Sequence, residues 1–164
     1  MGHPKKQKKK YETPLRPWNK ARIESEKAIL EKFGIRRKKE IWKTESILRN
    51  IRRRARELLA KSDEKKEKEL FAKLNNMNIH CSKLDDVLGI TLEDVLSRRL
   101  QTIVYKKGIA NTPLHARQLI VHGHVLVDDR KVKWPSYIVG SGEEDAISLD
   151  QTLAAKMVKE EVKK

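Results

Sequence analysis

The stretch from Arg98 to Val139 changes its hydrophobic period at Gly123, and this change limits the fold more than any other feature of the chain. Before Gly123 the apolar residues recur every three or four positions, which is the period of an α-helix. After Gly123 they alternate with polar residues, which is the period of a half-buried strand. The stretch therefore predicts two short helices packed on a short antiparallel sheet.

The first of these helices is expected to present arginines to a partner. On a helical wheel its apolar side chains share one sector, which comprises Leu92, Leu96, Leu100 and Ile103. Arg98 points away from that sector and is expected to be free. Arg99 lies at its edge, where the stem packs and the guanidinium stays in water. Lys106 and Lys107 follow, and Gly108 closes the helix.

The second helix begins with a hydroxyl cap at Thr112 and a proline at the first helical position, where no N–H donor is lost. Its buried stripe is Ala116, Leu119 and Ile120. A hairpin with a turn near Asp129–Arg130 is expected next. Val125 and Val127 alternate with His124 and Leu126 in its first strand, and Val132 and Trp134 alternate with Lys131 and Lys133 in its second strand. The polar side chains off these faces are the predicted RNA contacts: Arg98, Arg99, Lys106, Lys107, His115, Arg117, Gln118, His122, His124, Arg130, Lys131 and Lys133.

Composition favours a polyanion as the partner. The 164 residues carry a formal net charge of +15, with 38% hydrophobic and 5% aromatic residues. So large a surplus favours nucleic acid through counterion release. A membrane surface is the competing polyanion, but no apolar run is long enough to span one and no signal-peptide pattern is present. We therefore expect a cytoplasmic protein, and the single Cys81 excludes an internal disulfide framework and a multi-cysteine zinc site.

The positive charge lies in two blocks. Residues 1–60 hold 20 basic and 7 acidic side chains, and residues 98–139 hold 8 basic and 2 acidic side chains. The segments 61–97 and 140–164 each carry an excess of two acids. Two RNA contact regions are therefore expected, and the remaining segments are scaffold.

The first 19 residues are a basic arm that is expected to be disordered when free. Its lysines are Lys5, Lys6, Lys8, Lys9 and Lys10. This pattern is compatible both with a solvated tail and with an arm that lies on RNA. Tyr11 and Trp18 either stack on bases or pack on the protein.

Residues 38 to about 60 predict a helix with an apolar sector beside a ridge of Arg49, Arg52, Arg53 and Arg56. Arginine suits bidentate phosphate contact, so this ridge is expected to hold RNA backbone without reading its sequence. A solvated basic face is the alternative. A structural helix over 20–33 precedes it. A helix over 62–76 follows, capped by Ser62. Another is expected over 82–89, where Ser82 and Asp85 have capping-box spacing, and Thr91 and Asp94 repeat that spacing.

These patterns divide the chain into a basic arm (1–19), a helical RNA-binding domain (20–97), an α+β RNA-binding module (98–149) and a tail (150–164) that packs back or frays. His115, His122 and His124 lie close to Asp128 but have no nucleophile beside them. His80 and Cys81 have no further ligands nearby. We therefore expect no enzyme activity, no catalytic residues, no metal site and no cofactor, and we assign the three histidines to phosphate, ribose and base contacts.

The residues RRL, HARQLIVHGHVLV and WPSYIV resemble the RNA-binding module of the small-subunit ribosomal protein S-four family. The leader GHPKKQKKKYETPLRPW is similar to the archaeal and eukaryotic branch, so the resemblance covers nearly the whole chain. Bacterial members commonly have aspartate after Arg-Arg-Leu, whereas this chain has Gln101, so their local arginine–aspartate pairing is not carried over.

The resemblance implies a structural constituent of the small subunit that binds 16S-type rRNA directly and early. It also implies a role in nucleating assembly of the subunit body, a neighbouring ribosomal protein S-five, a part in translational accuracy and a position near the mRNA entry. A stand-alone RNA chaperone or rescue factor is the alternative. An RNA-modifying or tRNA-charging enzyme with the same module would need a catalytic domain, for which the chain has no motif.

Overall fold

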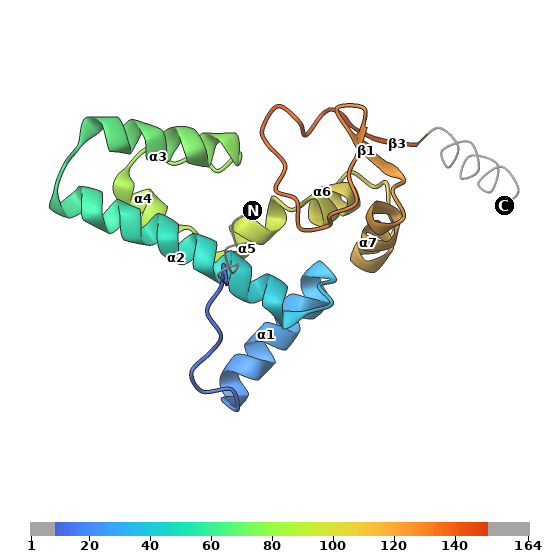
Figure 1. Ribbon diagram of the computed structural model, residues 1–164, viewed down its shortest axis with the longest axis horizontal. Coiled ribbons are helices and arrows are strands. Elements are labelled where there is room, and N and C mark those ends of the chain that lie inside the picture. The colour runs from blue at the N-terminus through green and yellow to red at the C-terminus, as the bar shows by residue number, and fades with distance from the viewer. Residues whose placement is uncertain (1–8, 151–164) are drawn as a thin grey trace, which may run out of the picture.

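The computed structural model describes residues 9–150, which form seven helices and three short strands. The helical part comprises α1 (Lys20–Phe33), α2 (Lys38–Ala60), α3 (Glu64–Asn76), α4 (Leu84–Gly89) and α5 (Leu92–Ser97). The second part comprises α6 (Leu100–Lys106), α7 (Pro113–Val121), β1 (Val125–Val127), β2 (Arg130–Lys131) and β3 (Ile147–Leu149). The molecule is elongated, with α2 and α3 at one end and α7 with the small sheet at the other (Figure 1). The predicted α+β class is confirmed.

Helix α2 is the central helix of the helical part, because α1, α3, α4 and α5 all contact it. Its buried residues recur at the helical period and are Ile41, Thr44, Leu48, Ile51, Ala55 and Leu58. The C-terminal part of this stripe, from Leu48 to Leu58, packs with Leu70 and Leu74 of α3 and Val87 of α4 in one apolar cluster. The predicted bounds of the helices over 20–33 and 38–60 are confirmed.

Two of the three predicted helix starts between residues 62 and 94 are shifted by one residue. Asp63, not Ser62, caps α3, and its carboxylate accepts from the Lys65 and Lys66 amides at 3.2 and 3.5 Å. At α4 the Asp86 carboxylate, not that of Asp85, accepts from the Lys83 amide at 3.0 Å. The box of Thr91 and Asp94 is confirmed, with the Thr91 amide donating to Asp94 at 2.8 Å.

The helix predicted to run through Arg98 is broken there, so the expectation of one continuous helix is wrong. Arg99 has extended backbone angles (φ −73°, ψ 141°) and pairs with Ile138 as an antiparallel bridge. The Leu100 amide donates to the Tyr137 carbonyl at 2.8 Å, and the Val139 amide donates to the Arg98 carbonyl at 3.1 Å. The distant segment 137–139 thus separates α5 from α6.

The second part has its own core, built from α6, α7 and β1. The core residues include Leu100, Ile103, Val104, Ala116, Leu119, Ile120, Val125, Val127, Val139 and Ile147. The sheet has the order β2-β1-β3, with both pairs antiparallel. The hairpin turn is Asp128–Asp129, not Asp129–Arg130: both residues have positive φ (46° and 61°), as a type I′ turn requires. Trp134 lies beyond β2 and is 69% exposed, so it does not continue the buried alternation.

The segment before α1 lies partly on α2. The Tyr11 ring stacks on Trp42, with centroids 6.2 Å apart, and the Glu12 carboxylate pairs with Arg49. Tyr11 therefore packs on protein, whereas Trp18 is 89% exposed. Lys5, Lys6, Lys8 and the tail after Asp150 lie outside the described residues.

Candidate nucleic-acid interface

Three arginines of the predicted ridge stand on the exposed side of α2. Arg49, Arg53 and Arg56 are spaced four and three residues apart, opposite the stripe that α2 buries. Arg49 pairs with Glu12, and Arg53 Nε lies 3.7 Å from the Glu57 carboxylate. Because these partners are exposed, the pairs are weak and a stronger anion displaces the carboxylates readily.

The fourth arginine of the ridge turns inward, contrary to the expectation. Arg52 Nη2 donates to the Ile90 carbonyl at 2.6 Å, and its Nε is buried with no hydrogen-bond partner within the described chain. Arg52 lies at the flank of the buried stripe, so its guanidinium reaches the segment between α4 and α5. It joins these elements and is not part of the exposed ridge.

Arg98 is held by an acid and is not free. Its Nη2 donates to Glu144 Oε2 at 2.6 Å, and its side chain is only 12% exposed. The hydrogen bond from Arg98 holds the pKa of Glu144 below its ordinary value. The expectation of a free Arg98 was wrong because it treated α5 and α6 as one helix, and the break at this residue turns the side chain toward the acidic turn.

Arg99 and Arg117 both bind one carboxylate, that of Glu40 on α2. Arg99 is 4% exposed and donates to Glu40 Oε2, so the expectation that its guanidinium stays in water is wrong. Arg117 Nη2 donates to Glu40 Oε1 at 2.9 Å, and its Nη1 donates to Oε2 at 3.2 Å. Burial raises the pKa of Glu40, but these hydrogen bonds outweigh it, so the pKa lies below its ordinary value of 4.5. The network joins α2 to the second part of the molecule.

Gln101 completes this junction, and the sequence did not indicate its role. Its side chain is 1% exposed. Its Nε2 donates to the carbonyls of Phe33, Gly34 and Pro113 at 3.1, 2.9 and 2.9 Å, and its Oε1 accepts from Arg117 at 3.3 Å. An aspartate accepts the arginine but has no N–H to give to the carbonyls. Gln101, in place of the aspartate of Arg-Arg-Leu-Asp, therefore forms hydrogen bonds to carbonyls that an aspartate cannot form.

The remaining predicted contacts of the second part stay at the surface. His122 and His124 stack with ring centroids 6.2 Å apart, and the Lys133 stem lies against Gly123 between them. Lys131 pairs with Asp150 at 2.7 Å, and Lys107 Nζ donates to the Glu144 carbonyl. The other side chains that are exposed or partly exposed are Lys106, His115, Gln118 and Arg130.

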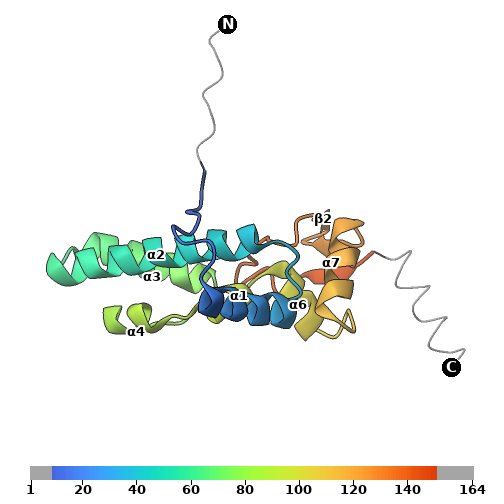
Figure 2. The same ribbon diagram turned by 90° about the horizontal axis from the view of Figure 1, so that it is seen from below.

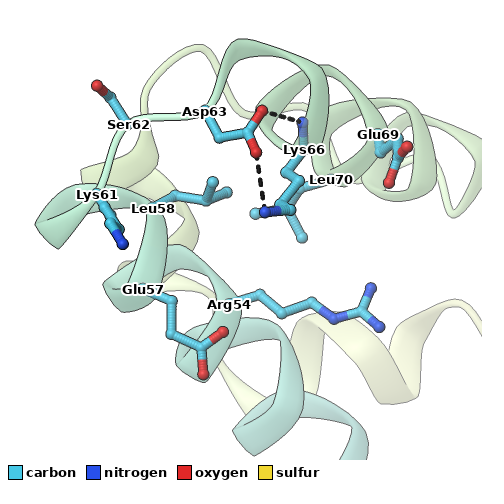
Figure 3. Close-up of a pocket in the computed structure, with 9 residues that line it drawn as sticks. All are labelled: Arg54, Glu57, Leu58, Lys61, Ser62, Asp63, Lys66, Glu69 and Leu70. Atoms are coloured by element: carbon cyan, nitrogen blue, oxygen red, sulfur yellow. Dashed lines mark hydrogen bonds and ion pairs between the residues drawn. The ribbon is translucent and has the colours of Figure 1, made fainter.

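A surface hollow of about 820 Å³, called here the larger hollow, lies between the facing ends of α2 and α3 (Figure 3). Three basic side chains (Arg54, Lys61 and Lys66) and three acidic ones (Glu57, Asp63 and Glu69) line it. Lys66 Nζ lies 2.9 Å from the Asp63 carboxylate. Since the charges balance, this hollow has no preference for an anion.

The smaller hollow, of about 260 Å³, is lined by residues from both parts of the molecule: Arg37, Lys39, Glu40, Lys43, Arg117, Pro135 and Ser136. Four of these residues are basic and one is acidic. Of the basic residues, the sequence interpretation included only Arg117. The signal for Arg37 and Lys39 was the basic run Arg36-Arg37-Lys38-Lys39, whose position relative to α7 is not visible in the sequence, and Lys43 had no such signal.

Seen edge-on, α2, β2 and the segment that leads into α1 lie toward one side, and α1, α4 and α6 lie toward the other (Figure 2). Helix α2, which carries the exposed arginines, and strand β2 of the basic hairpin therefore lie toward the same side of the molecule (Figure 2).

Comparison with known proteins covers most of the chain. The family model described as the S4 domain matches residues 98–145, and the model described as the ribosomal protein S4/S9 N-terminal domain matches residues 1–97. The small ribosomal subunit protein uS4 of Methanothermobacter thermautotrophicus is 49% identical over 152 residues, which cover 90% of this chain and 89% of the relative. The chain belongs to the uS4 family of ribosomal proteins.

Other uS4 relatives agree. The protein of Methanococcus aeolicus is 49% identical over 90% of this chain and 87% of its own length, and that of Saccharolobus islandicus is 48% identical over 95% and 90%. The resemblance to the archaeal type of the S-four family is confirmed, and so is the prediction of a non-enzymatic ribosomal protein. The two uS4 family models meet at residues 97 and 98, where α5 ends and the break before α6 begins.

No helix within residues 9–150 is long and apolar enough to cross a membrane. Over the same range, no group of three or more His, Cys, Asp or Glu side chains is placed to hold a metal ion.

Proposed function

We propose that this chain is a structural constituent of the small ribosomal subunit that binds small-subunit rRNA directly. The observation that carries the proposal is the set of exposed arginines on α2 together with the exposed basic and imidazole side chains of α7 and the hairpin, on elements of which α2 and β2 lie toward the same side of the molecule (Figure 2). Such a surface suits the phosphate backbone of a folded RNA. The uS4 relatives, which are named as small-subunit proteins, support the same function.

The contacts divide by chemistry. Arginines and lysines hold phosphates and set the register, whereas histidine and glutamine side chains reach ribose and bases. The proposed contacts are Lys5, Lys6, Lys8, Lys9, Lys10, Arg49, Arg53, Arg56, Lys106, Lys107, His115, Gln118, His122, His124, Arg130, Lys131 and Lys133. Arg52, Arg98, Arg99 and Arg117 are left out because internal carbonyl or carboxylate groups already hold them.

The finer roles are part of the same proposal. The protein works in the cytoplasm, nucleates assembly of the subunit body, contributes to translational accuracy, and neighbours ribosomal protein S-five and the mRNA near its entry. The acidic turn at Glu143 and Glu144 is held inward by Tyr137 and Arg98, so it does not oppose RNA at the basic face. The domain limits at residues 19, 97 and 149 belong to this proposal as well. The stand-alone chaperone is disfavoured, because the N-terminal ribosomal model matches all of residues 1–97.

A binding titration of the full-length protein tests the function. Small-subunit rRNA is compared with an equal mass of large-subunit rRNA at several salt concentrations. We expect tighter binding to small-subunit rRNA that persists at about 0.15 M salt, because specific sites typically exceed non-specific ones by a factor of at least about a thousand. Equal affinity for the two RNAs at every salt concentration would contradict the proposal.

A further inference from the structure

The smaller hollow is a site of its own, and we propose that it binds one phosphodiester group of the rRNA backbone. It lies where the start of α2 faces α7 and the loop after β2, so a phosphate in it would contact both parts of the molecule at once. This inference rests on the proposed function and adds to it a site that includes three residues outside the predicted contacts: Arg37, Lys39 and Lys43.

The charge of the hollow is unbalanced. Its single carboxylate, Glu40, is already engaged by Arg99 behind the hollow and by Arg117 at its wall, at 2.9 and 3.2 Å in the case of Arg117. Two guanidiniums thus compensate one carboxylate before any ligand arrives. The positive charges of Arg37, Lys39 and Lys43 are then left over for an anion.

These three side chains have no acidic partner in the part of the chain that the structure describes. Arg37 and Lys43 are exposed and form no ion pair with any residue between 9 and 150. Lys39 Nζ lies 5.2 Å from the centre of the Tyr11 ring, a contact that leaves its charge uncompensated. In the larger hollow, by contrast, acids and bases are equal in number and Lys66 is paired with Asp63 (Figure 3).

The types of group in the hollow suit phosphate. A guanidinium donates two parallel N–H groups to two oxygens, and ammonium groups add point charges. Ser136 at the rim adds a hydroxyl donor. The tie between Lys39 and Tyr11 also places the segment carrying Lys9 and Lys10 beside the hollow, so an RNA strand can pass from one to the other.

A pair of double variants tests the site in full-length protein. Arg37→Gln with Lys43→Gln removes two charges from the smaller hollow, and Arg54→Gln with Lys66→Gln removes two from the larger one. We expect the first variant to bind small-subunit rRNA about tenfold more weakly at 0.15 M salt, with a log–log salt slope shallower by about one. The control variant should change affinity by less than about twofold. Equal losses in the two variants, or no loss in the first, would overturn the inference.

Lysine protection measures the same site without any substitution. The native protein, free and bound to small-subunit rRNA, is treated with an acetylating reagent and analysed by mass spectrometry. We expect Lys39 and Lys43 to be protected in the complex, and unchanged reactivity of both overturns the site. Release of rRNA is also compared in phosphate and chloride buffers of equal ionic strength, for wild type and for the variant of the smaller hollow. If phosphate releases rRNA selectively and to the same extent from both proteins, phosphate binds elsewhere and the proposed site is overturned.

The failure of this site is distinguishable from failure of the function. If wild type binds small-subunit rRNA and the hollow variant binds it equally well, only the site is wrong. If wild type does not prefer small-subunit rRNA, the proposed function fails and the site fails with it.

Discussion

Gln101 illustrates how a single buried amide joins the two parts of the molecule. The two hydrogens of its Nε2 are shared among three carbonyls that end α1 and begin α7, and its oxygen accepts from Arg117. Gly34 lies against it with φ +59°, and a Cβ at Gly34 would lie 2.7 Å from Pro113 Cβ. The junction is thus tightly fitted and fully hydrogen-bonded around one side chain.

Replacing Gln101 by leucine should destabilise the fold strongly. The change keeps a side chain of similar size but removes the hydrogen bonds to the carbonyls and to Arg117. We expect the free energy of unfolding, measured in urea, to fall by about 3 kcal/mol, because buried polar groups are left unpaired. Gln118→Leu is the control on the exposed face of α7 and should change the stability by less than about 0.5 kcal/mol. Similar losses in the two variants would show that the amide does not hold the junction.

Glu40 should make stability depend on pH. Its pKa is below the ordinary 4.5 in the folded protein, so its ion pairs stabilise the fold above that pH and are lost as the pH falls through the lower folded value. Glu40→Gln should cost about 3 kcal/mol at pH 7, since the buried guanidinium of Arg99 and the partly buried one of Arg117 lose their carboxylate. The difference from wild type should shrink toward pH 3, whereas Glu31→Gln on the surface should show little difference at either pH. A constant difference for Glu40→Gln would refute this role.

The sequence identified these charged residues but not their partners. Arg99 meets Glu40 across 59 residues of chain, and Arg98 meets Glu144 across 46. Helical periodicity describes only neighbours within a few turns. It therefore assigned these arginines to a ligand, when distant acids in the same chain hold them.

At the level of elements, structure that depends on local interactions was predicted well. The start of α1 at Asn19 and the caps at Thr91 and Thr112 follow from adjacent side chains and backbone amides, and the extent of α2 follows from the helical period of its buried stripe. The break at Arg99 was missed because it is made by backbone pairing with Ile138, far along the chain. Helix ends set by local caps are thus readable from sequence, and ends set by distant pairing are not.

The exposed ridge of α2 should contribute strongly to the salt dependence of RNA binding. Replacing Arg49, Arg53 and Arg56 by glutamine should make the log–log slope of rRNA affinity against salt shallower by about two, because each phosphate contact contributes roughly 0.7 to 0.9. Preference for small-subunit rRNA should persist, since backbone contacts do not read sequence. The control replaces Lys65, Lys68 and Lys73 of α3 by glutamine. An identical change of slope in both triple variants would indicate general charge loss and contradict the ridge.

At the level of the whole molecule, the elongated fold has separate apolar cores in its two parts, and α2 and β2, which carry exposed basic residues, lie toward the same side (Figure 2). Composition predicted the polyanion partner, because a charge of +15 on 164 residues leaves few alternatives. It did not predict the smaller hollow, which exists only because α2, α7 and the loop after β2 meet. Sites within one element were visible in the sequence, whereas a site shared between elements needed the fold.

Sedimentation of cell extract tests directly whether this chain is an integral ribosomal component. Gradients are run at moderate and then at high salt, and the copies of the protein per small subunit are counted by mass spectrometry. We expect one copy per small subunit in both gradients, because contacts along a whole face and at the smaller hollow hold the protein jointly. Substoichiometric protein, or protein released by the salt that strips loosely bound factors, would contradict this function and identify a transient RNA-binding factor.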